Sequence, residues 1–157
     1  MASNYERLIR LAEESFDPAN NPDVLDVDEA ALERLRQIDP ATVSEESDEN
    51  GPVAWILIFP TTSELMEAFV RKEISESELL YRTPLDADYD AVYLCSALVL
   101  EEYRRRGITK RLAENALEKL MAKFPIRTLF AWPFSNEGRL AAEKIAHDMN
   151  LSLIFRS

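Results

Sequence analysis

The sequence predicts an α+β fold built on a central mixed β-sheet that helices flank. Two observations support this class. Segments with helical periodicity and short strand-like runs follow one another in the order helix, helix, strands, helices, strand, helix, strand, helix, strand. A turn signal joins the first two strand-like runs, whereas the later runs alternate with helices, and together they favour a mixed sheet.

Length and composition favour a single folded domain. At 157 residues, the chain is long enough for one substantial hydrophobic core. Hydrophobic residues make up 46% of the chain and charged residues 30%, the balance of an ordinary globular protein. No repeat, linker or low-complexity tract divides the sequence. We therefore expect residues 1–157 to form one domain.

The chain is strongly acidic. Asp and Glu number 29 against 18 Lys and Arg, which gives a formal net charge of −11. Such a surface repels phosphate backbones and anionic lipid, so we expect neither nucleic acid nor a membrane as a partner. It would attract a cationic small molecule or a basic peptide, although acidity more often serves solubility alone.

Cysteine and histidine usage exclude several classes of site. The single cysteine, Cys95, allows no intrachain disulfide and no cysteine-built metal site. The single histidine, His147, has no second histidine and no cysteine nearby, so we expect no metal centre. The sequence shows no secretion signal and no run of 18 apolar residues, and a reducing cytoplasm is the expected location.

Two helices are predicted near the N-terminus. The first covers residues 5–16, and Asp17-Pro18 ends its apolar periodicity. The second begins after Asp26 or Asp28 and presents one apolar face until Asp39-Pro40.

A β-hairpin and two short helices follow. The strand-like runs "ATVSEES" and "PVAWILIFPT" flank "DENG", in which Asn50-Gly51 is a favoured pair for a tight turn. Thr61 and Glu64 have the spacing of a capping box, and Ser75 with Glu78 repeats that spacing. Each pair stands before apolar residues at helical spacing, which predicts a helix start.

The second half of the chain alternates strands with helices. "AVYLCSALVL" is dense in apolar side chains, as expected of a central strand that is buried on both faces. An amphipathic helix then covers residues 108–123, and Pro125 closes it. The remaining segments "RTLFAWPFS", "NEGRLAAEKIAHDMN" and "LSLIFRS" are predicted as strand, helix and strand.

Three arginines, Arg104 to Arg106, stand where the helix at 108–123 begins. Basic side chains at a helix N-terminus cost about 0.3 to 1 kcal/mol each. A bound polyanion explains that cost, because guanidinium forks and free backbone N–H groups then converge on its oxygens. Gly107 lets the chain bend and lets a ligand approach closely. The alternative is a solvated charge run that pairs with Glu101, Glu102 and Glu114.

The segment "LVLEEYRRRGITKRL" resembles the GNAT superfamily of acyl-CoA-dependent N-acetyltransferases. The family motif is Gln or Arg, two residues, Gly, one residue, then Gly or Ala, and Arg104, Gly107 and Thr109 stand at its marked positions. Thr109 replaces the small last residue, and would either crowd the turn or donate a hydroxyl to phosphate. The likeness covers residues 91–155 and implies a GNAT-like fold.

The resemblance also implies a site for acetyl-CoA. Its pyrophosphate would be bound by Arg104, Arg105, Arg106, Gly107, Ile108 and Thr109. Backbone groups around Ala97 and Val99 would bind pantetheine where two central strands separate. Pro133 fits such a loss of strand pairing, and equally fits the end of an edge strand. Asn136 matches an asparagine that often contacts the cofactor, and is equally a good N-cap.

Acetyl transfer to an amine needs donors to the developing oxyanion and an acid for the leaving thiolate. Tyr93 stands where some members carry a catalytic glutamate, and would either relay a proton through water or serve packing. The tyrosine acid of many members is absent from the last helix. Ser96, or the neighbouring Cys95, would substitute for it, although a cysteine in an apolar run more often behaves as a buried hydrophobe.

The sequence therefore predicts an enzyme that transfers an acetyl group from acetyl-CoA to a small-molecule or peptide amine, directly within a ternary complex. Two alternatives stay open. One is a GNAT-fold protein that binds CoA without catalysis, as a sensor or interaction module; the other is a domain whose loop is only a charged patch. Because the family commonly ends in two strands, the acceptor wall is either incomplete here or completed by a second subunit in a homodimer.

Overall fold

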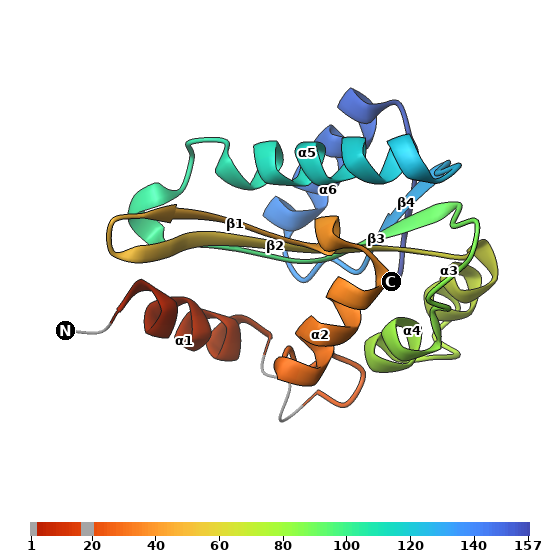
Figure 1. The fold of residues 1–157 in the computed structure, drawn as a ribbon, viewed down its shortest axis with the longest axis horizontal. Coiled ribbons are helices and arrows are strands. Elements are labelled where there is room, and N and C mark those ends of the chain that lie inside the picture. Colours follow the sequence, from red (N-terminus) through yellow and green to blue (C-terminus); the bar gives the residue numbers. More distant parts are fainter. Residues whose placement is uncertain (1–2, 17–20) are drawn as a thin grey trace.

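The computed structural model describes residues 3–16 and 21–157 (Figure 1). Its α-helices are α1 (Asn4–Phe16), α2 (Glu29–Ile38), α3 (Ser63–Val70), α4 (Glu76–Arg82), α5 (Ile108–Lys123) and α6 (Asn136–Met149). Its strands are β1 (Val43–Asp48), β2 (Gly51–Thr61), β3 (Ala91–Val99), β4 (Thr128–Ala131) and β5 (Ser152–Phe155). Two short 3-10 helices, η2 (Pro40–Thr42) and η3 (Glu101–Tyr103), precede β1 and α5.

The strands form one mixed sheet in the order β1-β2-β3-β4-β5, with β3 at its centre. The β1–β2 and β2–β3 pairs are antiparallel, whereas the β3–β4 and β4–β5 pairs are parallel. Figure 1 shows α1 and α2 on one face of the sheet, with α5 and α6 on the other. The predicted α+β class with a mixed sheet is therefore confirmed.

Two clusters of buried side chains hold these layers together. The larger one fills the space between the sheet and its helices; in α5 it takes Ala113, Ala116, Leu117 and Leu120, which share one helical face. That face agrees with the helix predicted at residues 108–123. The smaller cluster joins Leu8 of α1 to Leu100 and Ile108, the residues that flank the segment 101–107, called the arginine loop below. Both ends of that loop are thus fixed in the core.

Helix starts follow the predicted chemistry with one correction. Asp28 is the N-cap of α2, and Ser75 and Glu78 form a capping box at α4. The capping box predicted at Thr61 is wrong, because Thr62 is the N-cap of α3 and accepts from Leu65 N–H. Thr61 ends β2 instead, where its buried hydroxyl lies 2.7 Å from that of Thr83. The stop predicted at Asp17-Pro18 lies outside the described residues.

The hairpin forms as predicted, but its turn is one residue earlier. Asp48 pairs with Gly51, so Glu49 and Asn50 are the turn residues in place of Asn50-Gly51. The carboxylate of Asp48 accepts from Asn50 N–H at 2.7 Å, which stabilises the turn locally. Gly51 then adopts a φ of 114°, a conformation that favours glycine.

Candidate functional site

The sheet opens beside its central strand. Strands β3 and β4 pair only as far as Leu94 and Ala131. Beyond Leu94, β3 continues to Val99 with β2 as its one strand partner in the described chain, and a register shift leaves Cys95 bulged. Pro133, which cannot donate to a ladder, lies just beyond β4, in agreement with the predicted loss of pairing there. Backbone groups on the open side of β3 are therefore available to a ligand.

A cleft of about 680 Å³ occupies this opening. Leu11 and Ser15 of α1 line one end, and side chains of α5 and α6, such as Ala113 and Ala141, line the other. In Figure 1, α1 lies on the opposite face of the sheet from α5 and α6. Because residues of all three helices line the cleft, it reaches both faces of the sheet. Small-molecule sites commonly have volumes of about 300 to 1,000 Å³. The cleft is therefore open beside β3 from both faces of the sheet.

The start of α5 has the geometry of an anion site. Gly107 is the N-cap with a φ of 72°, and Arg105 also adopts a left-handed φ of 65°. No side chain of the described residues caps this helix, so the first backbone N–H groups of α5 have no acceptor of their own. A Cβ atom on Gly107 would meet nothing within 4 Å. The described chain thus leaves open space directly beside these donors.

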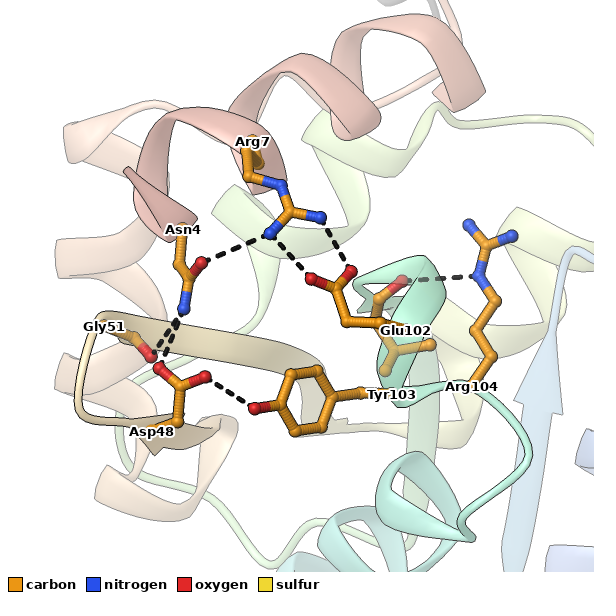
Figure 2. Close-up of polar contacts among 8 residues, drawn as sticks. Asn4, Arg7, Asp48, Gly51, Glu102, Tyr103 and Arg104 are labelled. Carbon is orange, nitrogen blue, oxygen red and sulfur yellow. Dashed lines mark hydrogen bonds and ion pairs between the residues drawn. The ribbon is translucent and has the colours of Figure 1, made fainter. Parts of the chain in front are cut away.

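The arginines of the loop make no ion pair within residues 3–16 and 21–157. Arg104 donates from Nε to the carbonyl of Val99 at 3.4 Å, and the Arg106 guanidinium lies 4.8 Å from the Tyr103 ring centroid. The carboxylate of Glu102 points at Arg7 instead (Figure 2). The pairs that the charge-run alternative requires are therefore not made in the described structure.

Two lysines that the sequence did not single out also line the cleft. Lys110 binds Asp148 of α6 and Glu114, both at 2.8 Å, and these hydrogen bonds raise the pKa of Lys110. Lys144 of α6 is exposed and has no ion-pair partner in the described ranges. With Arg104 they line the cleft beside one carboxylate, Glu137, whereas Asp148 and Glu114 offset the charge of Lys110 from just outside that lining. Arg104 and Lys144 are therefore the cations of the lining that have no ion-pair partner in the described ranges.

The predicted cofactor residues fall into three groups. Ala97, Val99, Arg104 and Thr109 line the cleft. Arg105, Arg106, Gly107 and Ile108 belong to the adjoining loop and helix start, without lining the cleft itself. Asn136 is the first residue of α6 and does not line the cleft. The N-cap role for Asn136 is wrong, because Ser135 is the N-cap and its Oγ accepts from Gly138 N–H at 3.0 Å.

Tyr93 lies in the core and outside the cleft lining. Its side chain is 1% exposed, and its hydroxyl donates to the carboxylate of Glu76, which is 3% exposed. The other oxygen of Glu76 accepts from Leu25 N–H at 2.8 Å. Burial raises the pKa of Glu76 and raises that of Tyr93 well above its usual value. This geometry matches the packing alternative for Tyr93, and its catalytic role stays a prediction.

Ser96 is half-buried and lines the cleft next to Cys95. Burial raises the pKa of the Cys95 thiol well above its usual value, the Glu76 carboxylate adds to that rise, and the hydrogen bond with Ser96 opposes it. The thiol is therefore protonated near neutral pH and is a poor nucleophile. The hydroxyl of Ser96 remains as a polar donor beside the bulge of β3.

Neither a metal centre nor a membrane span is found in the part of the chain that the structure describes. No group of three or more His, Cys, Asp or Glu side chains there could hold a metal ion. None of the helices there combines the length and the apolar composition needed to cross a bilayer.

Comparisons with known proteins agree with this architecture. The chain is similar to the crystal structure of ribosomal-protein-alanine N-acetyltransferase from Brucella melitensis biovar Abortus 2308, with a TM-score of 0.51 and 15% sequence identity. The match covers 90% of this chain and 81% of that chain, and at this identity it shows the fold alone. No curated protein matches the sequence. Residues 5–143 match the acetyltransferase (GNAT) family model, and since this is most of the chain, the protein belongs to the GNAT family of acetyltransferases.

Proposed function

We propose that this protein transfers an acetyl group from acetyl-CoA to an amine, directly within a ternary complex. Membership of the GNAT family supports acetyl transfer in general. The acetyl donor, the amine acceptor and the mechanism are what we propose. One observation carries it. In an acidic chain, the arginines Arg104 to Arg106 have no ion-pair partner in the described residues and lie at an uncapped helix start, beside a cleft that reaches both faces of the sheet.

The described residues fit the parts of CoA. Its diphosphate would accept hydrogen bonds from backbone N–H groups at residues 107–109 and from the guanidinium groups of Arg104, Arg105 and Arg106. Its extended pantetheine arm needs backbone-like donors and acceptors. We propose that Ala97 and Val99 would supply them, on the part of β3 that β4 leaves unpaired. Asn136, at the start of α6, would contact the same arm.

In this reaction, a bond forms between the amine nitrogen and the acetyl carbon while the thioester C–S bond breaks. The amine loses a proton, and the sulfur of CoA gains one. Backbone N–H groups near Val99 would polarise the thioester carbonyl, and holding both reactants in one cleft would supply much of the rate. Ser96 would donate a hydrogen bond to the leaving sulfur, and the proton that the amine loses would pass to that sulfur through this hydroxyl or solvent. The proton relay through Tyr93 is kept as a second hypothesis.

The amine would enter from the α1 face, because the opposite face holds the proposed diphosphate site. Leu11 and Ser15 line that end of the cleft. The similar solved structure is named a ribosomal-protein-alanine N-acetyltransferase. A peptide with an N-terminal alanine therefore belongs in the acceptor panel, together with small amines. One domain over residues 1–157, a cytoplasmic location and a homodimer belong to the proposal as predictions from the sequence.

Calorimetric titration with CoA tests the proposed site. Replacing Arg104 and Arg106 together with alanine should weaken CoA binding by about 10- to 100-fold, because two charge-assisted contacts are lost at exposed positions. The matched control replaces Arg36 and Arg127, two exposed arginines outside the cleft lining. Equal affinity of both double variants would refute the diphosphate site.

CoA release across the acceptor panel then tests catalysis. Turnover with at least one amine supports the enzyme. CoA binding without turnover of any amine would favour the non-catalytic sensor or interaction module.

A further inference from the structure

The arginine loop is anchored at its ends and exposed in its middle. Leu100 and Ile108 are 3% and 5% exposed and lie in the same buried cluster as Leu8 of α1. Between them, residues 104–107 are all exposed. The conformation of this segment therefore depends on a few side-chain contacts. Those of Glu102 and Tyr103 join it to the residues that are most distant in the sequence.

Glu102 and Tyr103 tie the loop to two distant elements (Figure 2). Arg7 of α1 donates to both carboxylate oxygens of Glu102, at 2.8 and 2.7 Å. The hydroxyl of Tyr103 donates to Asp48 of the hairpin at 2.6 Å. Asn4 links the two ties, since its Nδ2 donates to Asp48 at 2.9 Å and its Oδ1 accepts from Arg7 at 3.4 Å. A bidentate arginine–carboxylate pair is geometrically specific.

Without its pairing to Arg7, Glu102 would compete for the proposed anion site. Its carboxylate stands two residues before Arg104 and four before Arg106, so a free Glu102 would pair with these guanidinium groups and repel a phosphate. Its hydrogen bonds with Arg7 lower the pKa of Glu102 to about 2, with a smaller contribution from the charge of Arg106. Glu102 is thus ionised throughout the physiological pH range, and protonation does not remove the competition.

We propose that Arg7 is a positioning residue for the acetyl-CoA site: it engages Glu102, and so leaves Arg104 and Arg106 free for the diphosphate. This inference rests on the proposed function. Arg7, Leu11 and Ser15 have a spacing of four residues and lie along one side of α1. The side of α1 that holds Glu102 therefore continues to the cleft lining formed by Leu11 and Ser15.

The test measures CoA affinity and steady-state kinetics for four variants at low ionic strength: Arg7→Ala, Glu102→Gln, the double variant, and Arg10→Ala as the matched control. Arg10 is on the same helix, is exposed, and has no ion-pair partner in the described ranges. Arg7→Ala should weaken CoA binding about tenfold and raise the KM for acetyl-CoA with kcat unchanged. Adding Glu102→Gln to Arg7→Ala should recover at least about threefold of that loss, because the competing charge is gone.

Other outcomes would overturn the inference. If Arg7→Ala, Glu102→Gln and the double variant bind CoA equally weakly, the pair is a structural tie and Glu102 is no competitor. If Arg7→Ala binds CoA as Arg10→Ala does, the pair has no effect on the site. Salt gives a further readout, since 0.5 M NaCl should shrink the Arg7→Ala defect if charge competition causes it. Absence of CoA binding by the unchanged protein would overturn the proposed function and this inference together.

Discussion

Replacing Gly107 with alanine separates the cost of backbone strain from the loss of a binding site. Gly107 has a φ of 72°, where an L-residue costs about 1 to 2 kcal/mol. A Cβ there meets no atom within 4 Å, so no steric cost adds to the strain. For a chain of this size, 1 kcal/mol lowers Tm by about 2 to 4 °C. Gly107→Ala should therefore fold, with a Tm lower by about 2 to 8 °C.

The same methyl group should have a larger effect on CoA binding. It would occupy the open space beside the N–H groups of α5, where the diphosphate is proposed to lie. We expect a loss of CoA affinity of about tenfold or more, equivalent to about 1.4 kcal/mol. Calorimetry gives this loss, and thermal unfolding without ligand gives the stability.

Gly51→Ala is the matched control. Gly51 has a φ of 114°, and a Cβ there would lie 3.6 Å from the Cβ of Asn4, an ordinary contact. It should lose at least as much stability as Gly107→Ala but lose less affinity for CoA, because Gly51 lies in the β1–β2 hairpin and not at the start of α5. If Gly107→Ala also keeps full affinity at a similar loss of Tm, the diphosphate does not bind beside Gly107.

Three other predictions concern the centre of the molecule. Ser96→Ala should lower kcat by about 10²-fold with CoA affinity unchanged, since it removes the proposed donor to the leaving sulfur. An unchanged kcat in assays of CoA release would contradict that role. Tyr93→Phe leaves the buried Glu76 without one hydrogen bond, so urea unfolding should show a loss of about 1 to 3 kcal/mol while kcat stays constant; a hundredfold fall in kcat at normal stability would establish the relay through Tyr93 instead. Burial raises the pKa of Glu76 above its usual 4.5. Between pH 4.5 and the folded-state pKa, the folded protein therefore binds more protons than the unfolded chain. The free energy of unfolding should fall as pH rises through that window. Glu76→Gln should abolish that contribution, and identical pH profiles for the two proteins would show that the carboxyl is not responsible.

Local patterns in the sequence predicted the framework of the site. The apolar stripe of α5 gave its bounds at residues 108–123, and Gly107 marked the turn before it. The capping box of Ser75 and Glu78 also formed as predicted. These features depend on neighbours within about four residues, where helix geometry and capping dominate. The turn lies at Glu49 and Asn50, one residue earlier than predicted, because the pairing register of β1 with β2 determines its position.

Contacts between distant segments carry the rest of the site, and no local pattern indicates them. Arg7 and Glu102 are 95 residues apart, and only the packing of α1 beside the arginine loop brings them together. Lys144 lines the cleft because α6 packs against α5, where Asp148 binds Lys110. Likewise, the hydroxyl of Tyr93 in β3 finds its partner in Glu76, the first residue of α4, only because α4 packs near β3. Each of these required the tertiary structure.

Labelling the backbone nitrogen of glycine offers the most direct test of the diphosphate site, because the chain contains three glycines, Gly51, Gly107 and Gly138. A [¹⁵N]glycine-labelled sample therefore gives three amide peaks, which Gly51→Ala and Gly107→Ala assign. Saturating CoA should shift the Gly107 peak most, shift Gly138 in the cleft lining less, and leave Gly51 in place. If CoA binds and the Gly107 peak does not move, the diphosphate lies elsewhere and the account of the arginine loop is wrong.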